Sequence, residues 1–391
     1  MMVGGGLRLG LDARLLAYNR GGIARYIGAL GRALAALAAH EPFDDLVAVY
    51  HRKDREQALA ASGWRGVTAW TPPHHRLERW ALAAELAPRS LDLLHSPDHV
   101  PSGAGRARSV VTVHDLAFLL YPDTHSAESR RYYAQVAWAV ERADRIIAVS
   151  EATRQDLVRE VGADPTRIRV VYEAAPAHWL DPDTTSGDAQ QPAAGHSDIG
   201  EGNRVSVPAL FAQPYVLSVQ ATIEPRKNIP RLIEAFAQVH RSRPELRLVV
   251  AGGPGADDLV VQAAVARHDL AQAVDFPGVL SEARLQAAYR GALALVYPSL
   301  YEGFGLPLLE AMALGTPAIA AQVSSLPEVA GEAALLVDPL DVDAIAAAMD
   351  RVVSDEALRA DLTACGYRRV RYFSWERAAQ ETLAVYREAL E

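Results

Sequence analysis

The chain has 391 residues, a length that predicts two or three domains and excludes a small disulfide-stapled module. Half of its residues are hydrophobic, which excludes a chain that is disordered throughout. Its 39 basic and 48 acidic residues give a net charge of −9, and nucleic acid is therefore not expected as the main partner, because binding to phosphate backbones requires a basic face.

Cysteine usage and hydropathy indicate the compartment. A single cysteine, Cys365, cannot form an internal disulfide, so a reducing compartment is expected and the cytoplasm is the default. The N-terminal residues show no basic region followed by a long apolar segment, and no run of about 18 apolar residues occurs anywhere. We therefore expect neither secretion nor a membrane span.

Short β-branched runs alternate with longer Ala-, Leu- and Arg-rich stretches of helical period, the pattern of βα units around parallel sheets. The first series of predicted strands covers residues 7–12, 46–50, 91–95, 110–114, 146–149 and 168–171. The second series covers residues 215–219, 246–251, 274–276, 294–297, 318–320 and 334–337.

Residues 181–213, between the two series, are rich in Pro, Gly, Ser, Asp and Gln and have no apolar period, so we expect a linker or flexible insert there. They separate residues 1–180 from residues 214–372. The sequence predicts two doubly wound α/β domains facing each other across a cleft, with ligands at the carboxyl ends of the parallel strands.

The most informative segment is VYPSLYEGFGLPLLEAMALGTPA at residues 296–318. A predicted strand ends near Tyr297, a glycine-containing loop follows, and Pro307 stands where a first helical position is expected, since its missing N–H costs nothing there. Gly303 and Gly305 would let backbone N–H groups approach a bound group closely. Because a helix N-terminus favours anions, this pattern indicates a diphosphate site.

Two carboxylates accompany these glycines, Glu302 on the loop and Glu310 on the helix. Carboxylates are poor partners for phosphate but good acceptors for the hydroxyls of a ribose or a sugar. The alternative is an ordinary strand–turn–helix in which both carboxylates are solvated.

This Glu-x7-Glu element with GFGLPLLEAMA resembles the signature of the retaining glycosyltransferases of family 4. Further matching segments follow in order: Gly21 and Gly22, TVHD at 112–115, IIAVSEATRQDL at 146–157, EPRKN at 224–228, LVVAGGPG at 248–255 and FSWERAAQETLAVYREAL at 373–390. The resemblance covers nearly the whole chain except residues 181–213. It implies the GT-B fold: two Rossmann-like doubly wound domains, with acceptor bound by the N-terminal one, nucleotide-sugar by the C-terminal one, and residues 373–391 forming a helix that returns to the N-terminal domain.

The resemblance also assigns roles. It implies that Glu310 holds the ribose hydroxyls, that Glu302 contacts the transferred sugar, and that His114 lies beside the donor sugar. Arg226 and Lys227 would neutralise the diphosphate, where charge gathers as the nucleotide departs. The alternatives are a histidine satisfied in a strand-end turn and a solvated helix start, although two cations ahead of a helix oppose its dipole.

The other residues that the resemblance places at the donor form three glycine-containing segments. They are Gly21 and Gly22 after the first strand, Gly278, Val279 and Leu280 near the base, and Gly303, Phe304, Gly305 and Leu306 near the sugar or diphosphate. The chain departs from the family pattern at Ala221, where a glycine is common, and at Thr222, where many members have arginine. One phosphate contact of the family is therefore expected to fall to Arg226.

Two further patterns in the sequence resemble other classes of site. VVAGGPGADD at 249–258 approaches a dinucleotide fingerprint, but Asp258 stands where the third glycine belongs, so an NAD-dependent oxidoreductase is a minor alternative. Asp341-x-Asp343 and Asp181-x-Asp183 have the spacing of a metal-binding carboxylate pair, yet Asp341 is better interpreted as a helix cap. No zinc pattern is recognisable among the histidines, and we expect no cofactor and no required metal.

Residues 76–89, RLERWALAAELAPR, place Trp80 and three further apolar residues near one helical face with arginines at its edges. Most helices with this pattern pack on their own core, and the alternative is an interfacial helix in peripheral contact with the inner face of the membrane. The run RRYY at 130–133 is a candidate lining of an acceptor groove.

The resulting hypothesis is a metal-independent, retaining hexosyltransferase that acts on a saccharide or lipid-linked acceptor. TIEPRKN resembles the branch with many mannosyltransferases, so GDP-mannose is the first donor and UDP-glucose the second. A GT-B-like sugar-nucleotide epimerase or hydrolase, and a non-catalytic nucleotide-binding protein, are the alternatives.

Overall fold

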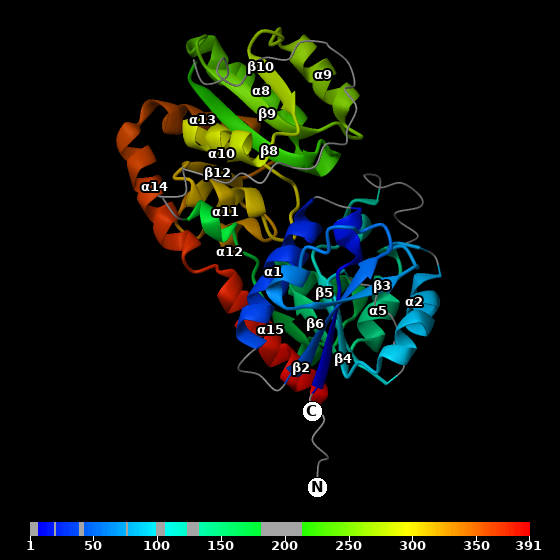
Figure 1. The fold of residues 1–391 in the computed structure, drawn as a ribbon. Helices are drawn as coiled ribbons and strands as arrows, with labels where there is room; N and C mark the ends of the chain where they lie inside the picture. Colours follow the sequence, from blue (N-terminus) through cyan, green and yellow to red (C-terminus); the bar gives the residue numbers. More distant parts are fainter. Residues whose placement is uncertain are drawn as a thin grey trace. The chain divides into compact units, whose positions relative to one another are not determined.

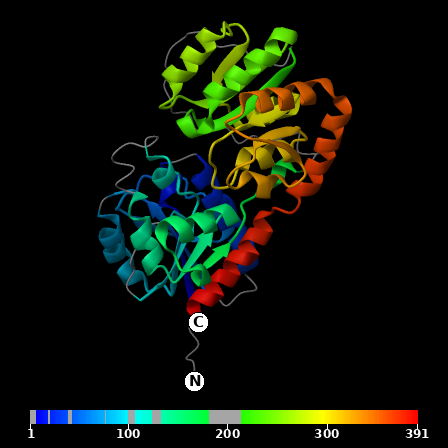
Figure 2. The ribbon, with the colours of Figure 1, turned by 180° about the vertical axis from the view of Figure 1, so that it is seen from behind.

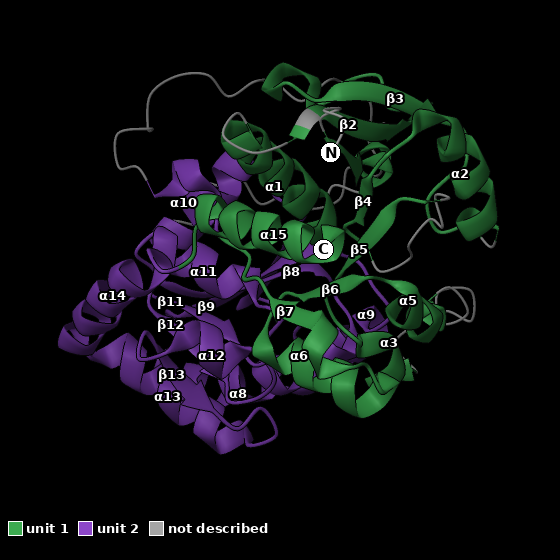
Figure 3. Ribbon diagram, turned by 90° about the horizontal axis from the view of Figure 1, so that it is seen from below, with its two compact units in different colours: residues 1–174, 373–391 green, residues 175–372 purple. Residues whose placement is uncertain are grey.

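A computed structural model describes residues 7–18, 21–38, 43–75, 77–98, 106–122, 133–180 and 213–391. These residues form two compact units, unit 1 with residues 1–174 and 373–391 and unit 2 with residues 175–372 (Figure 3). The predicted linker lies outside the described residues apart from Gln213, as do Arg76 and residues 130–132.

In its described part, unit 1 contains a seven-stranded parallel sheet in the order β3-β2-β1-β4-β5-β6-β7. The strands are β1 (Leu7–Asp12), β2 (Phe43–His51), β3 (Arg65–Ala69), β4 (Leu93–Ser96), β5 (Arg108–Val113), β6 (Arg145–Ala148) and β7 (Ile168–Val170). All six predicted strands of this half are confirmed to within a few residues. The edge strand β3 was not predicted, because only Val67 and Ala69 of its five residues are buried.

The helical segments of unit 1 cover both faces of this sheet and bury apolar side chains against it. They are η1 (Arg14–Ala17), α1 (Gly22–Ala38), η2 (Ala60–Ser62), α2 (Glu78–Leu86), η3 (Ala87–Arg89), α3 (Ala117–Leu120), α5 (Val136–Arg142), α6 (Glu151–Asp156), η5 (Leu157–Val161), η6 (Pro165–Arg167) and α15 (Trp375–Leu390). The last of these, α15, lies along α1 and contacts β4, β5 and β6 (Figures 1 and 2). The C-terminal segment thus completes the core of unit 1, where Leu383 and Tyr386 are buried.

The described part of unit 2 contains a six-stranded parallel sheet in the order β10-β9-β8-β11-β12-β13. The strands are β8 (Tyr215–Thr222), β9 (Arg247–Gly253), β10 (Val274–Gly278), β11 (Ala294–Tyr297), β12 (Ala318–Ala321) and β13 (Ala334–Val337). All six were predicted, and the apolar runs of the central strands β9, β8, β11 and β12 are buried on both faces, as parallel sheets require.

The helical segments of unit 2 connect these strands. They are η7 (Ala177–Trp179), η8 (Pro225–Lys227), α8 (Ile229–Ser242), α9 (Asp258–Arg267), α10 (Glu282–Gly291), α11 (Leu306–Ala313), α12 (Leu326–Ala330), α13 (Val342–Ser354) and α14 (Glu356–Val370). Asp341 caps α13 by accepting a hydrogen bond from the Ala344 N–H at 2.9 Å, as predicted.

The strand order of each sheet reverses direction near its centre, between β1 and β4 in unit 1 and between β8 and β11 in unit 2. Loops that leave the carboxyl ends of these two neighbouring strands diverge to opposite faces of the sheet and open a crevice, where doubly wound folds bind ligands. In unit 2 these loops carry Arg226 and Lys227 after β8 and Glu302 after β11. Across the described ranges, no helix is both long and apolar enough to span a membrane.

Candidate functional site

Arg226 and Lys227 lie on η8, directly after β8. Pro225 starts this short turn, and Asn228 ends it with a positive φ of 59°, a conformation that asparagine tolerates better than most residues. The turn therefore presents both cations at the carboxyl end of the sheet before α8 begins.

These two cations meet one carboxylate. The Lys227 ammonium donates to Oε1 of Glu302 at 2.6 Å, and a guanidinium nitrogen of Arg226 donates to Oε2 at 3.2 Å. The Tyr297 hydroxyl donates to the same Oε1 at 2.7 Å. Glu302 and Lys227 are each only 7% exposed, and the Arg226 side chain, 16% exposed, is paired with Glu302, so the alternative of solvated side chains is wrong.

The two loops that carry the cluster are bound to each other by hydrogen bonds. The Leu300 N–H donates to the carbonyl of Arg226 at 2.7 Å. The side-chain amide of the buried Asn228 donates to the carbonyls of Pro298 and Pro339 at 3.0 and 2.7 Å. These bonds hold the ends of β8 and β11 in one geometry, so the charged groups are positioned before any ligand arrives.

Electrostatics fix the charge state of Glu302. Burial by itself would raise the pKa of this carboxyl group, but the charges of Lys227 and Arg226 and the hydrogen bonds from Lys227 and Tyr297 lower it to about 2. Burial lowers the pKa of Lys227, an effect that the Glu302 charge opposes. Burial and the neighbouring carboxylate raise the pKa of Tyr297, which keeps its hydroxyl protonated as a donor.

The glycine loop between Glu302 and α11 is held from the neighbouring segment after β12. The Glu302 N–H donates to the Ser324 hydroxyl at 3.0 Å, and the Ser325 hydroxyl contacts the carbonyls of Glu302 and Phe304 at 2.9 and 2.8 Å. Gly305 adopts a φ of 108°, and a Cβ there would lie 2.7 Å from Leu326. Neither serine was predicted, because nothing in the sequence pairs residues 324–325 with residues 302–304.

Glu310 lies on α11 and is 3% exposed, so it is not the solvated carboxylate of the alternative interpretation. The Tyr289 hydroxyl of α10 donates to its Oε2 at 2.7 Å, and the carbonyl of Tyr289 in turn accepts a hydrogen bond from Thr316. Tyr289 is a supporting residue that the sequence analysis did not identify.

The loop after β9 approaches the site loop closely. A Cβ on Gly252 would lie 2.4 Å from the carbonyl oxygen of Gln220, and one on Gly255 would lie 2.0 Å from that of Ile223. Both glycines therefore leave room for the backbone at the end of β8. This close packing explains the glycines of residues 249–258, which resemble a dinucleotide-binding fingerprint, without requiring a bound dinucleotide. Gly278 ends β10 with a φ of 71°, and Val279 beside it is exposed.

His114 lies in unit 1, after β5, and both of its ring nitrogens have partners. Nδ1 lies 2.8 Å from a carboxylate oxygen of Glu173, and Nε2 lies 2.8 Å from the carbonyl oxygen of Pro97. A carbonyl only accepts, so Nε2 donates, and an ionised Glu173 requires a proton on Nδ1 as well. Burial alone would lower the pKa of His114, but the hydrogen bond to Glu173 and its charge raise it.

A buried polar chain lies behind this histidine. His95 is hydrogen-bonded to the Tyr386 hydroxyl at 2.7 Å and to the Thr112 hydroxyl at 2.8 Å, and Thr112 lies 3.0 Å from the Tyr26 hydroxyl. The Tyr26 ring packs edge-on against His114. Burial lowers the pKa of His95 to about 3, so it is a neutral core residue.

The predicted site residues thus fall into two groups. In unit 2, the structure brings Arg226, Lys227 and Glu302 into contact and places Glu310 on the helix that follows. In unit 1, His114 follows β5, and the predicted glycine pair of residues 21–22 lies at the start of α1. Within the described part of the chain, no three His, Cys, Asp or Glu side chains gather closely enough to hold a metal ion.

Comparisons with known proteins identify the family of the chain. Residues 20–176 match the family model for Glycosyltransferase Family 4, and residues 206–369 match that for Glycosyl transferases group 1. The chain is 31% identical over 332 residues to the O-antigen chain mannosyltransferase B of Escherichia coli, covering 82% of this chain and 80% of that protein.

Solved structures share the fold. Sucrose-phosphate synthase from Thermosynechococcus elongatus superposes with a TM-score of 0.74 and 24% identity, covering 97% of this chain and 98% of that one. The Anabaena protein HepE in complex with UDP-glucose gives a TM-score of 0.68 and 18% identity, covering 97% and 99%. The chain is therefore a glycosyltransferase of family 4, and its two parallel-sheet units are the Rossmann-like domains of the GT-B fold.

Proposed function

We propose that this glycosyltransferase moves mannose from GDP-mannose to a saccharide or lipid-linked acceptor, with retention of the anomeric configuration. The observation that carries the proposal is the buried Arg226–Lys227–Glu302 cluster at the switch point of unit 2. Support for mannose comes from the similarity to a mannosyltransferase. UDP-glucose is the second candidate donor, and it is the nucleotide sugar bound by the structural neighbour HepE.

In the proposed reaction, the bond between the anomeric carbon and the diphosphate oxygen breaks, and the acceptor hydroxyl oxygen forms a new bond to that carbon on the same face. The acceptor proton passes to the departing phosphate oxygen, so the products are a glycoside and a nucleoside diphosphate. Negative charge develops on the diphosphate, where fixed cations stabilise a transition state most. Arg226 and Lys227 supply these cations, and we propose that no divalent metal or other cofactor is required.

The carboxylates act on hydroxyl groups in this proposal. Glu302, held ionised by its neighbours, accepts from the transferred sugar, and Glu310 accepts from the ribose of the donor. The glycine loop from Gly303 to Leu306 offers backbone N–H groups to the sugar or diphosphate at the start of α11. Residues 278–280 lie near the base, and His114, Gly21 and Gly22 serve the donor sugar and acceptor from the N-terminal domain.

A direct assay tests the donor and the reaction type. The purified protein is incubated with GDP-mannose or UDP-glucose, with and without mannosyl oligosaccharide acceptors, and products are identified by mass spectrometry and NMR of the anomeric proton. We expect an α-linked product from GDP-mannose that still forms in excess EDTA. Donor consumption that acceptors do not accelerate would instead indicate an epimerase or hydrolase, and inversion at the anomeric carbon would overturn retention.

We also propose that the protein acts in the cytoplasm and touches the inner face of the membrane through α2. Leu77, just before α2, and Trp80 on it are 47% and 56% exposed, which supports this contact. The predicted single apolar face of α2 is wrong, however, because Leu82 and Leu86 are buried in the core of unit 1. Only the residues on the outer side of the helix are available to a membrane surface.

A further inference from the structure

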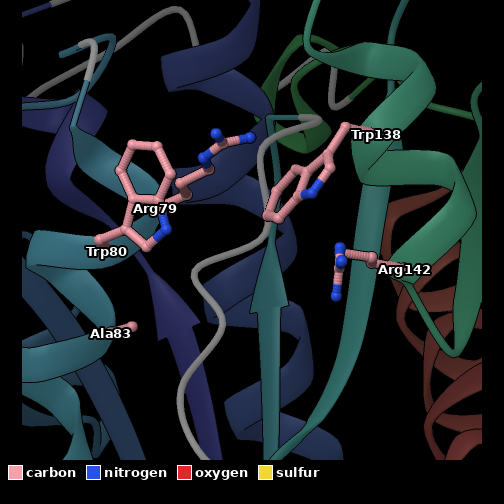
Figure 4. A pocket seen from close by; sticks show the side chains of 5 residues that line it. All are labelled: Arg79, Trp80, Ala83, Trp138 and Arg142. Atoms are coloured by element: carbon pink, nitrogen blue, oxygen red, sulfur yellow. The ribbon is translucent and has the colours of Figure 1, made fainter.

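A pocket of 540 Å³ lies between α2 and α5 of unit 1 and plays no part in the proposed donor chemistry. It is lined by Arg79, Trp80 and Ala83 from α2 and by Trp138 and Arg142 from α5 (Figure 4). The spacing of these residues along α2 and α5 explains why their side chains line one pocket. Positions 79 and 83, and positions 138 and 142, are each one turn apart, while the opposite faces of both helices are buried in the core.

The two indole rings hold the cations in place. The Arg79 guanidinium carbon lies 3.8 Å from the ring centroid of Trp80 and 4.9 Å from that of Trp138. The Arg142 guanidinium carbon lies 5.3 Å from the Trp138 centroid. Both guanidinium groups therefore lie within cation–π distance of Trp138, and this contact restrains each planar group while leaving N–H groups to donate.

The positive charge of the pocket is not neutralised within the part of the chain that the structure describes. Neither Arg79 nor Arg142 forms an ion pair there, and the buried Nε of Arg79 has no hydrogen-bond partner. The adjacent carboxylate of Glu78 is already paired with Arg14. A buried guanidinium donor without a partner is costly, so the pocket is suited to an anion that supplies several acceptor oxygens.

We propose that this pocket binds a phosphate ester, with the phosphate held between Arg79 and Arg142 and the organic part of the ester against the two indole rings. Phosphate offers the acceptor oxygens that guanidinium groups bind in pairs, and a ring or glycerol unit matches the flat apolar faces. The ester has two possible sources, the headgroup of an anionic phospholipid in a bilayer or the phosphate of a soluble glycosyl phosphate. Because Trp80 is exposed at the edge of the pocket, a lipid headgroup and a soluble glycosyl phosphate can both reach it.

The test compares both sources on matched variants. Binding of glycerol 3-phosphate and mannose 1-phosphate is measured by titration calorimetry and tryptophan fluorescence, and binding to vesicles of phosphatidylglycerol or phosphatidylcholine by co-sedimentation. The double variant R79Q/R142Q removes the cations of the pocket. The double variant R32Q/R55Q removes the same charge from exposed arginines of the same unit and serves as the control.

We expect at least one source to bind, with affinity lowered tenfold or more by R79Q/R142Q and unchanged by R32Q/R55Q. Binding of phosphatidylglycerol vesicles or glycerol 3-phosphate without binding of mannose 1-phosphate identifies the lipid headgroup, and binding of mannose 1-phosphate identifies a glycosyl phosphate. Absence of binding to all four probes, or equal loss in both double variants, would overturn the proposal. Thermal stabilisation by GDP and UDP, measured in parallel, tests the donor site separately, so failure of one proposal is distinguishable from failure of the other.

Discussion

Replacement of Glu302 by glutamine removes the one carboxylate that Lys227 and Arg226 share, while keeping the shape of the side chain. The Lys227 ammonium then lies in a buried site without its anion, 7% exposed and in contact with the Tyr297 hydroxyl at 3.4 Å. Breaking a buried ion pair on one side costs roughly 3–5 kcal/mol. The structure therefore predicts a large loss of stability from a nearly isosteric change.

The lowered pKa of Glu302 gives a second value for the stability that E302Q loses. The difference between an ordinary pKa of 4.5 and a folded-state pKa of about 2 corresponds to about 3 kcal/mol. For a unit of this size, each kcal/mol moves the melting temperature by roughly 2–4 °C. We therefore expect E302Q to melt roughly 6–12 °C below the parent protein at pH 7.

The pH dependence has a definite sign. Because the pKa of Glu302 is lower in the folded chain than in the unfolded chain, its stabilisation is complete above about pH 4.5 and is lost as the pH falls toward 2. Differential scanning calorimetry at pH 7, 5 and 3 should show a gap between the parent protein and E302Q that narrows in acid. The exposed Glu332 of the same unit provides the control variant E332Q, which should melt with the parent protein.

A double-mutant cycle isolates the interaction. If Lys227 and Glu302 stabilise each other, the double variant K227M/E302Q should lose less stability than the sum of the two single variants. Additive losses, or a gap between E302Q and the parent protein that is the same at pH 7 and pH 3, would refute the reasoning that a buried ion pair fixes this site.

Three further outcomes are expected. K227A should lower turnover with the nucleotide-sugar at least about 100-fold and abolish thermal stabilisation by nucleoside diphosphates, and wild-type turnover would contradict its role. E173Q should lower the pKa of His114, measured by NMR of its ring, because the carboxylate raises that pKa; an unchanged pKa would show that Glu173 does not hold the proton. G305A should destabilise the protein by roughly 1–3 kcal/mol in urea unfolding, since a Cβ would meet Leu326 at 2.7 Å and a φ of 108° disfavours alanine; a smaller loss would mean that the loop adapts.

Much of the fold follows from local patterns in the sequence. The buried strands of both sheets are short β-branched or alanine-rich runs, and twelve of the thirteen described strands were predicted from them. The exception, β3, is an edge strand with one buried face, and its few apolar residues give little signal. The sequence of β3, RGVTA, lacks the continuous apolar run that makes central parallel strands recognisable.

The site was only partly predictable, because pairwise contacts between distant segments leave no trace in a single sequence. The glycines and carboxylates around residue 302 indicated a ligand loop, but that Lys227 contacts Glu302 across 75 residues depends on the strand order. Supporting contacts from Ser324, Ser325 and Tyr289 were missed for the same reason. On α2, the prediction of one apolar face failed because Leu82 and Leu86 pack into the core of unit 1 while Trp80 stays exposed.

We propose that the cations after β8 bind the diphosphate of a nucleotide-sugar. Titration calorimetry of GDP, UDP, GDP-mannose and UDP-glucose, on the parent protein and on R226Q/K227M, tests it most directly. We predict that the parent protein binds the nucleoside diphosphate and the sugar nucleotide of one base, either guanine or uracil. The double variant should bind both of these ligands with an affinity at least tenfold lower. Equal affinity in the two proteins would contradict the assignment of Arg226 and Lys227 to the diphosphate.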